Sequence, residues 1–432
     1  MHIRPAKLVR GAIALPGDKS ISHRAAIIAA MADGETRIDN FASSVDCAAT
    51  LECLKKLGVR IRQEGATVWV VGVGKSGFQA PDKPLDCGNS GTTMRLMAGV
   101  LAGQEFETVL TGDASLRQRP MKRVIEPLSR MGARFESAEG KAPLTIYGRN
   151  PLKSTEYHLP IASAQIKSSI LLAGLNSDGE TAVVENVPTR DHTERMLRWF
   201  GVDVRETGSG GVKKISLTGE ERLSAAQLFI PSDISSAAFF IVAALGLAGS
   251  TLSMQNVGLN PTRTGVIEAL TLFGADIRRV NRREVNNEPV GDILVAGDLA
   301  AASEKVLRGG LIANLIDELP ILAILGTQLE SGLEVRDAGE LRVKETDRIA
   351  AVVENLRRMS ADVEEFDDGF RVGKSQLKGA RVDSYGDHRI AMAFSIAGLL
   401  ATGGATEIDG AECVDVSFPG FFETLQNVVV YE

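Results

Sequence analysis

The sequence predicts an α/β fold built from two similar domains, and three observations support this prediction. With 432 residues, the chain is too long for one ordinary hydrophobic core, so we expect two, or at most three, domains. Its 44% hydrophobic and 24% charged residues are typical of a globular protein rather than a disordered one. One pattern of helix, glycine turn and strand recurs six times along the chain, which indicates internal repeats.

Each repeat begins with a capping residue and a helix of small apolar residues, followed by a glycine turn and a short strand. Because the apolar residues of stretches such as 25–30 and 237–248 lie all round the helix, we expect these first helices to be buried between sheets. Alternating helices and strands give apparent repeats in many α/β chains, but the regular spacing favours a true repeat. Successive starts are 68, 77, 70, 84 and 70 residues apart, at Asp18, Asp86, Ser163, Asp233, Asp317 and Asp387.

A second helix follows the strand in each repeat. In four of the first five repeats this helix ends with a hydrophobic residue and a glycine before the next strand, as in KKLGVRI, and Ser360 replaces the glycine in the fifth. The sixth copy, SFPGFFETLQNVVV, is shorter. A repeat of about 70 residues is too small to be robust alone, so we expect three repeats to pack together in each domain.

The formal net charge of −7 gives no overall basic field that would attract nucleic acid or an anionic membrane. The stretch MHIRPAKLVRG lacks the apolar core of a signal peptide, and the longest apolar run, 237–249, is too short to span a bilayer. Four cysteines without disulfide-like or zinc-like spacing predict neither a disulfide framework nor a structural metal. They are Cys47, Cys53, Cys87 and Cys413. We therefore expect a cytoplasmic protein.

Polar residues gather at the repeat starts, where helix N-termini expose unpaired N–H groups and favour anions. GDKS at 17–20 is similar to the end of a nucleotide-binding P-loop, but Asp18 interrupts the required glycine–lysine pair. Taken singly, such motifs are better interpreted as caps or charged surfaces, and His23 and His388 have no companions at metal-ligand spacing. Together, the cations near the starts predict a site for a ligand with several negative charges. They are Lys19, Arg24, Arg119, Lys167, Arg190, Lys344, Arg348 and Arg389.

Seven motifs are distributed over almost the whole chain: LPGDKSISHR, GNSGTTMR, LRQRPM, SAQIKS, RDHTE, RVKETDR and YGDHRIAM. Together they resemble the signatures of the 5-enolpyruvylshikimate-3-phosphate synthases, also called 3-phosphoshikimate 1-carboxyvinyltransferases, within the enolpyruvyl transferase family. The resemblance implies two domains of three βαβαββ-type units each, with an active site in the interdomain cleft. It also implies that the chain crosses between domains near Asp18 and Ser232–Asp233. One domain then comprises residues 1–18 with 233–432, and the other comprises residues 19–232.

The resemblance also implies an activity. Enzymes of this kind transfer the enolpyruvyl group of phosphoenolpyruvate to the 5-hydroxyl of shikimate 3-phosphate through a tetrahedral intermediate and release phosphate. The reaction belongs to the shikimate pathway of aromatic amino-acid biosynthesis and requires no metal or organic cofactor. Gly91 would leave room beside phosphoenolpyruvate, so we expect inhibition by glyphosate. We expect a monomer with these small-molecule substrates and with no nucleic-acid or membrane partner.

The resemblance assigns roles to individual residues. Asp317 would act as the general base, Glu345 would handle the methylene proton, and Lys19 would complete the catalytic set. The residues implied for shikimate 3-phosphate are Lys19, Ser20, Arg24, Ser163, Ala164, Gln165, Arg190, Asp317 and Lys344. Those implied for phosphoenolpyruvate are Lys19, Gly91, Arg119, Gln165, Arg348 and Arg389.

Three positions depart from the pattern of many relatives. Glu340 stands in place of asparagine, Thr189 in place of serine, and Val416 where some members have a lysine beside phosphoenolpyruvate. Thr189 would still allow a hydroxyl–phosphate bond. One alternative is an enolpyruvyl transferase that acts on UDP-N-acetylglucosamine, although the stretch GDASLRQRPMK lacks the cysteine common in that branch. Another alternative is a non-catalytic anion-binding relative, although the acidic residues Asp317 and Glu345 are both retained.

Overall fold

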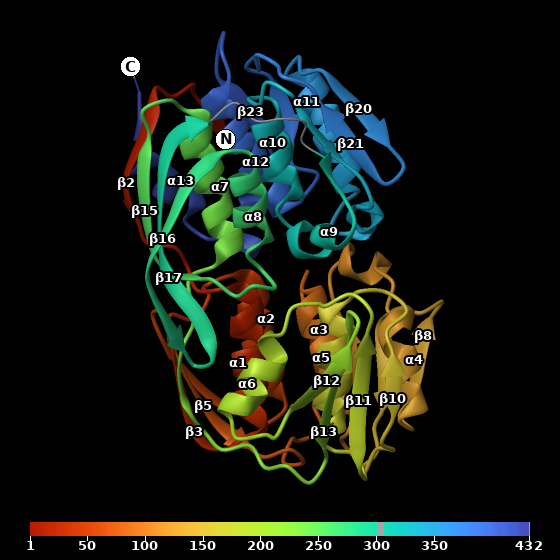
Figure 1. Ribbon diagram of the computed structural model, residues 1–432. Helices are drawn as coiled ribbons and strands as arrows, with labels where there is room; N and C mark the ends of the chain where they lie inside the picture. Colours follow the sequence, from red (N-terminus) through yellow and green to blue (C-terminus); the bar gives the residue numbers. More distant parts are fainter. Residues whose placement is uncertain (300–305, 432) are drawn as a thin grey trace. The chain divides into compact units, whose positions relative to one another are not determined.

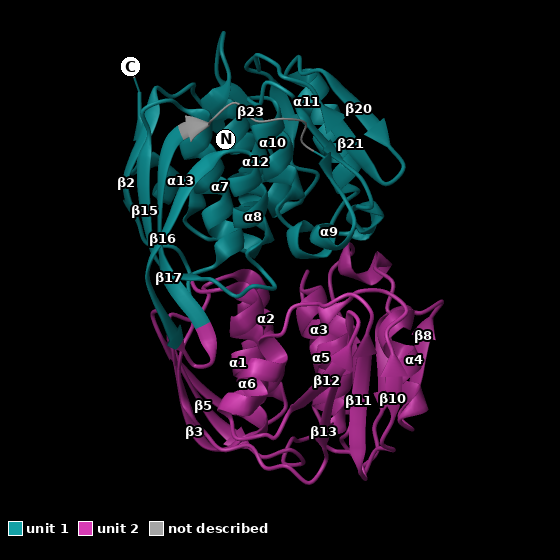
Figure 2. Cartoon of the chain, viewed as in Figure 1, with its two compact units in different colours: residues 1–16, 231–284, 289–432 teal, residues 17–230, 285–288 magenta. Residues whose placement is uncertain are grey.

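Figure 1 shows the computed structural model of the chain, which describes residues 1–299 and 306–431. The chain forms two compact units, which are coloured separately in Figure 2. Unit 1 comprises Met1–Pro16, Pro231–Glu284 and Pro289–Glu432, and unit 2 comprises Gly17–Ile230 and Val285–Glu288. Nothing in the sequence predicted that Val285–Glu288, at the tip of a long hairpin, would belong to unit 2.

Unit 2 contains three four-stranded sheets with one common topology. Their strands are β3 (Asp33–Asp39), β4 (Arg60–Glu64), β5 (Thr67–Val73), β6 (Leu85–Asp86), β7 (Glu107–Thr111), β8 (Arg134–Ala138), β9 (Lys141–Tyr147), β10 (Glu156–His158), β11 (Glu180–Glu185), β12 (Arg205–Ser209), β13 (Val212–Thr218) and β14 (Gln227–Phe229). The strand orders are β14-β3-β5-β4, β6-β7-β9-β8 and β10-β11-β13-β12. In each sheet the first two strands are parallel and the other pairings are antiparallel.

The helices of unit 2 alternate with these strands. They are α1 (Lys19–Met31), α2 (Val45–Lys56), α3 (Gly91–Ala102), α4 (Lys122–Arg130), α5 (Ala164–Gly174) and α6 (His192–Trp199), with the short 3₁₀ helix η1 (Leu116–Gln118). The first helices of the repeats, α1, α3 and α5, are buried along most of their length, with the sheets around them (Figure 1). Their small residues permit close contact: a Cβ atom on Gly99 of α3 would lie 2.2 Å from the carbonyl oxygen of Ser169 in α5.

Unit 1 contains one four-stranded sheet of the same topology, one sheet extended to five strands and one sheet of three strands. Its strands are β1 (His2–Ile3), β2 (Leu8–Ile13), β15 (Thr251–Gly258), β16 (Ala275–Val285), β17 (Glu288–Leu299), β18 (Val306–Leu307), β19 (Leu333–Val335), β20 (Val363–Phe366), β21 (Gly369–Val372), β22 (Arg381–Asp383), β23 (Thr406–Asp409) and β24 (Val429–Val430). The orders are β18-β19-β21-β20, β16-β17-β15-β2-β24 and β1-β23-β22. The N-terminal strands β1 and β2 therefore complete sheets whose other strands come much later in the sequence.

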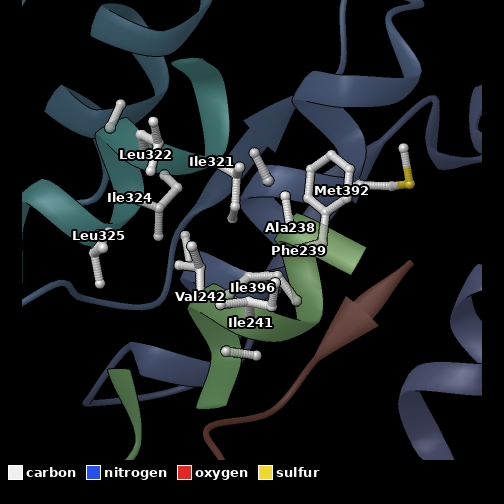
Figure 3. Close-up of a cluster of buried hydrophobic side chains, with 14 of the residues drawn as sticks. Ala238, Phe239, Ile241, Val242, Ile321, Leu322, Ile324, Leu325, Met392 and Ile396 are labelled. Carbon is white, nitrogen blue, oxygen red and sulfur yellow. The ribbon is translucent and has the colours of Figure 1, made fainter. Parts of the chain in front are cut away.

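The helices of unit 1 follow the same alternation. They are α7 (Ile234–Gly246), α8 (Gly265–Leu272), α9 (Gly310–Leu315), α10 (Leu319–Gly326), α11 (Arg348–Arg358), α12 (His388–Leu400) and α13 (Phe421–Gln426), with the 3₁₀ helices η2 (Gly339–Val343) and η3 (Ala411–Val416). Figure 3 shows the core that α7, α10 and α12 form, with Phe239, Ile321 and Ile396 among its members. Each such side chain contributes about 1.5–3 kcal/mol when it is fully buried.

The α/β class, the six-fold repeat and the buried first helices are confirmed. Five of the six first helices begin at a side-chain N-cap that accepts a backbone N–H bond, namely Asp18, Ser90, Ser163, Asp233 and Asp387. The predicted start at Asp86 was too early, because Asp86 ends β6 and Ser90 caps the helix. Asp317 lies in the turn between α9 and α10 rather than at a cap. None of the helices in the described ranges combines the length and apolar character needed to cross a bilayer.

Candidate functional site

In unit 2, Arg24 joins the starts of three helices. Its Nε donates to Thr193 Oγ1 of α6 at 2.7 Å, and its Nη2 donates to Ser168 Oγ of α5 at 3.0 Å. Its Nη1 donates back to the carbonyl oxygen of Ser20 at 2.8 Å. The side chain is only 3% exposed. Arg24 therefore fixes the N-terminal ends of α1, α5 and α6 beside one another.

Lys19, at the first position of α1, is more exposed to solvent than Arg24. Its Nζ lies 3.0 Å from Asp46 Oδ2 of α2, and the lysine side chain remains 16% exposed. A lysine ammonium carries three N–H donors, and at least one of them serves this bond with Asp46. Asp46 was not predicted from the sequence, because a single aspartate after a helix cap carries no motif.

Gln165 connects α5 to α3 in the same unit. Its Oε1 accepts from Arg95 Nη1 at 2.6 Å, and its Nε2 donates to Thr92 Oγ1 at 2.9 Å. Because Thr92 and Arg95 lie in the first turns of α3, this amide fixes the helix start that also carries Gly91. The predicted residues Gln165 and Gly91 thus belong to one cluster.

Gly91, which has no side chain, lets two guanidinium groups lie close to the start of α3. A Cβ atom at this position would lie 2.8 Å from Arg95 Nη1 and 3.4 Å from Arg119 Nη1. Arg119 follows η1, is 7% exposed, and donates from Nη2 to Asn89 Oδ1 at 2.7 Å. The N-terminus of α3, two guanidinium groups and a glycine without a side chain together favour a small anion. Asn89 and Arg95 both lie within the GNSGTTMR motif, but neither was predicted as a site residue.

Lys167, Glu185 and Glu194 form a buried ionic cluster at the start of α6, and Thr189 contacts it. Lys167 Nζ lies 2.7 Å from Glu194 Oε1 and 3.2 Å from Glu185 Oε2. Burial opposes the charge of Lys167, but the two glutamates outweigh it and raise the pKa of the ammonium. The Thr189 hydroxyl donates to Glu185 Oε2 at 2.8 Å. The Thr189 hydroxyl thus contacts a carboxylate, and the expected hydroxyl–phosphate bond stays a prediction.

The other predicted residues of unit 2 lie at helix starts. Ser163 caps α5, since its Oγ accepts from the backbone N–H of Ile166 at 3.4 Å, and Ala164 is the first residue of that helix. Arg190 is half-buried and directly precedes Asp191, the N-cap residue of α6.

In unit 1, Arg348 is shared by three carboxylates. Its Nε donates to Asp387 Oδ2 at 2.7 Å and its Nη2 donates to Glu345 Oε2 at 2.7 Å, while its Nη1 lies 3.4 Å from Asp317 Oδ1. The arginine is 1% exposed. Burial opposes its charge, but Asp387, Glu345 and Asp317 outweigh this effect and raise its pKa. Arg348 therefore brings the two predicted catalytic carboxylates, Asp317 and Glu345, to one cation.

Arg389 and Lys344 complete this cluster. Arg389 Nη1 donates to the Asp317 carbonyl oxygen at 3.0 Å, and its Nε lies 3.7 Å from Asp317 Oδ1. Burial lowers the pKa of Lys344, although the charges of Asp317 and Glu340 act in the opposite direction. The other four predicted residues of unit 1 therefore lie near Asp317 or contact its partner Arg348. Asp387 was not predicted as a partner of Arg348, because it was interpreted only as a helix cap.

The comparisons with known proteins agree with one another. The family model for EPSP synthase (3-phosphoshikimate 1-carboxyvinyltransferase) matches residues 3–425. The chain is 50% identical over 431 residues to a protein of Geotalea uraniireducens (strain Rf4) named 3-phosphoshikimate 1-carboxyvinyltransferase, and the match covers 99% of each chain. A protein of the same name from Geobacillus kaustophilus (strain HTA426) is 49% identical over 426 residues, 98% of each. The structure of EPSP synthase from Acinetobacter baumannii is similar with a TM-score of 0.87 and 43% identity, covering 100% of this chain and 98% of that one.

Proposed function

The chain belongs to the EPSP synthase (3-phosphoshikimate 1-carboxyvinyltransferase) family, and on this premise we propose that it transfers the enolpyruvyl group of phosphoenolpyruvate to shikimate 3-phosphate. The acceptor is the 5-hydroxyl, the second product is phosphate, and the reaction serves aromatic amino-acid biosynthesis through the shikimate pathway. The observation that carries the proposal is the match along almost the whole chain, at about half of all positions. The cluster around Arg348 supports it, because both acidic groups that the reaction needs meet there.

The addition step requires a base for the hydroxyl proton and an acid for the methylene carbon. We assign the base to Asp317. It is half-buried, and the guanidinium groups of Arg348 and Arg389 favour its ionised form. The hydroxyl oxygen bonds to the enol carbon while the methylene carbon gains a proton. The tetrahedral intermediate then loses phosphate and one methyl proton, which restores the carbon–carbon double bond in the product.

We assign the proton transfer at the methylene carbon to Glu345, with Lys344 holding the reacting hydroxyl. Glu345 accepts a hydrogen bond from Arg348 at 2.7 Å, which fixes the orientation of its carboxylate. Burial lowers the pKa of Lys344, and in this assignment its ammonium donates a hydrogen bond to the hydroxyl oxygen while Asp317 takes the hydroxyl proton. In these assignments Lys344 positions the reacting hydroxyl, and the adjacent Glu345 transfers the proton at the methylene carbon.

The charged clusters match the charge of the two substrates, each of which carries a phosphate and a carboxylate. For shikimate 3-phosphate we propose contacts with Lys19, Ser20, Arg24, Ser163, Ala164, Gln165, Arg190, Asp317 and Lys344. For phosphoenolpyruvate we propose contacts with Lys19, Gly91, Arg119, Gln165, Arg348 and Arg389. The two guanidinium groups beside Gly91 and the buried Arg348 support the second set.

A turnover assay tests the proposal. Purified protein is given phosphoenolpyruvate with either shikimate 3-phosphate or UDP-N-acetylglucosamine, and phosphate release is measured with each acceptor. We expect release only with shikimate 3-phosphate. Release only with the UDP-sugar would instead establish the sibling activity, and no release with either acceptor, despite a folded protein, would favour the non-catalytic relative.

We further propose that glyphosate inhibits the enzyme in competition with phosphoenolpyruvate and that the protein acts as a cytoplasmic monomer. The guanidinium groups of Arg95 and Arg119, both beside Gly91, suit a small ligand that carries phosphonate and carboxylate groups. A rate that is unchanged by millimolar glyphosate would contradict the first point. Light scattering at the protein concentrations of the assay tests whether the protein is a monomer.

A further inference from the structure

A chain of buried hydrogen bonds links α1, α2 and α3 in unit 2 and has no part in the mechanism proposed above. His23 Nδ1 lies 2.7 Å from Thr50 Oγ1, which in turn lies 2.7 Å from Thr93 Oγ1. The Thr93 hydroxyl donates to Ser90 Oγ at 2.8 Å. Each of these four side chains belongs to a residue that is at most 1% exposed. Solvent therefore does not compete for these bonds.

The chain can run in only one direction. The Thr93 hydroxyl has a single hydrogen, and it goes to Ser90 Oγ, so Thr93 must accept in its contact with Thr50. Thr50 consequently gives its own hydrogen to Thr93 and must accept in its contact with His23. His23 is then the donor, which places a proton on its Nδ1.

The second nitrogen of His23 indicates that the ring is neutral. Within residues 1–299 and 306–431, Nε2 is buried and makes no hydrogen bond. A proton there would create a buried donor without an acceptor, and a positive ring, close to the charges of Lys19 and Arg24. Burial, followed by the charges of Lys19 and Arg24, lowers the pKa of His23 well below its ordinary value, while Asp18 acts in the opposite direction. The ring is therefore the neutral Nδ1–H tautomer.

The two ends of the chain lie at the two helix starts that carry the proposed substrate contacts. His23 is one turn after Lys19 and directly precedes Arg24 on α1. Ser90 caps α3 by accepting from the backbone N–H of Thr93 at 3.1 Å, and Gly91 is the next residue. The Ser90 oxygen thus receives two hydrogens from Thr93, one from its backbone and one from its side chain.

We propose that His23 is a positioning residue for the phosphoenolpyruvate site, acting as a neutral Nδ1–H donor that orients the hydroxyls of Thr50 and Thr93 and thereby fixes the start of α3. This assignment rests on the proposed function, since it concerns how Gly91 is held for that substrate. A ring with only Nε2 protonated would offer Thr50 an acceptor in place of a donor and would leave the chain without its first hydrogen.

A set of variants with a matched control tests the role in kinetics. His23→Leu and Thr50→Val each remove one link, and we expect each to raise the KM for phosphoenolpyruvate about three- to tenfold, with kcat changed less than about twofold. The double variant should be no worse than the more affected single variant, because the chain is already broken. His23→Asn keeps an N–H donor near the position of Nδ1 and should restore most of the affinity. Thr108→Val is the control, since Thr108 is a buried threonine of the same unit whose hydroxyl makes no hydrogen bond within the described residues.

Equal KM values for His23→Leu, Thr108→Val and the wild type would overturn the proposal. So would losses in kcat alone, or effects of His23→Leu and Thr50→Val that add fully in the double variant.

A spectroscopic measurement decides the tautomer without any substrate. In protein labelled with ¹⁵N-histidine, the His23 signals are identified as those absent from His23→Asn, among the five histidines of the chain. We expect a protonated Nδ1 and an unprotonated Nε2 at neutral pH. Protonation of Nε2 would overturn the proposal even if the enzyme were active. If no acceptor were turned over, the proposed function would fail, and this measurement would still show whether His23 heads the chain.

Discussion

Lys167 and Glu194 form an ion pair in unit 2, with 2.7 Å between Nζ and Oε1, and neither side chain is exposed to solvent. Glu185 joins the pair at 3.2 Å from the same ammonium. One buried cation therefore compensates two buried carboxylates. It also holds the segment ahead of α6, because Lys167 Nζ lies 3.4 Å from the Thr189 carbonyl oxygen.

Lys167→Met should lower the free energy of unfolding by about 3–5 kcal/mol, because it leaves two carboxylates buried without a cation. Urea unfolding of the whole protein, monitored by circular dichroism, measures this loss of stability. Lys214→Met is the matched control, since Lys214 pairs with Glu156 at 2.6 Å but is 37% exposed. The control should cost less than about 1 kcal/mol. Equal losses in the two variants would show that the buried cluster contributes no more than a surface pair.

Asp317→Asn should lower kcat by about 10²–10⁴-fold, because it removes the proposed base. The free energy of unfolding should change little, since Arg348 keeps Asp387 and Glu345 as partners. Initial rates of phosphate release and thermal unfolding give both quantities. Asp409→Asn, which alters an exposed pair with Arg381, should leave the rate unchanged. A rate near that of the wild type in Asp317→Asn would remove this residue from the mechanism.

Gly91→Ala should raise the KM for phosphoenolpyruvate at least about tenfold, with little effect on the KM for shikimate 3-phosphate. The added carbon would lie 2.8 Å from Arg95 Nη1 and 3.4 Å from Arg119 Nη1, so at least one guanidinium must move. Stability should be nearly unchanged, because the crowded atoms are the ends of flexible side chains. Steady-state kinetics with each substrate varied in turn provide the comparison, and an equal rise in both KM values would contradict the assignment.

Gly99→Ala, eight residues further along α3, should lower stability and leave the KM for phosphoenolpyruvate nearly unchanged. Its added carbon would lie 2.2 Å from the backbone oxygen of Ser169, which cannot move without shifting α5. We expect a loss of about 1–3 kcal/mol in the free energy of unfolding. Gly310→Ala serves as the control, since in the described part of the chain no heavy atom outside Gly310, its chain neighbours and the nearby backbone of its own helix lies within 4 Å of the added carbon. If both variants melt at the temperature of the wild type, the close contact of α3 and α5 does not limit stability.

His23 predicts a pH dependence of stability. Its pKa is lowered in the folded state by burial and by Lys19 and Arg24, with Asp18 acting in the opposite direction. A lowered histidine pKa stabilises the fold above the ordinary value of about 6.5, and this contribution is lost as the pH falls below it. The stability advantage of the wild type over His23→Asn should therefore shrink by about 1 kcal/mol between about pH 7.5 and about pH 5.5. Urea unfolding at both values checks this, and a constant difference would contradict it.

Much of the fold could be predicted because the repeats carry local signals. A capping residue, small apolar residues and a glycine turn are readable within some 20 residues, and five of the six first helices begin at such a cap. The association of β1 with β23 could not be predicted, because His2 and Glu407 meet through long-range pairing that leaves no periodic signal. The membership of Val285–Glu288 in unit 2 depends on contacts of the same long-range kind.

Residues of the candidate site could be predicted where they belong to recognisable motifs. Residues that only form hydrogen bonds with those motif residues could not. Arg348 was predicted from its charge near a repeat start and Asp317 from the family resemblance, whereas Asp46 and Asn89 became visible only as hydrogen-bond partners of Lys19 and Arg119. The direction of a hydrogen bond was also beyond prediction. Thr189 was expected to allow a hydroxyl–phosphate bond, which stays a prediction, and the donation of its hydroxyl to Glu185 was not foreseen.

The late completion of the sheets in unit 1 has a consequence for how the protein is made. Strand β2 ends at Ile13, but its neighbour β15 begins only at Thr251, and β24 at Val429. At about 5–20 residues per second, a ribosome needs roughly 10–50 s to supply β15 after β2 has been synthesised. Nearly all of unit 2 emerges during that interval and can fold as a body of its own. The nascent N-terminus must wait, with both edges of β2 open to other chains, until the second half of the protein leaves the ribosome.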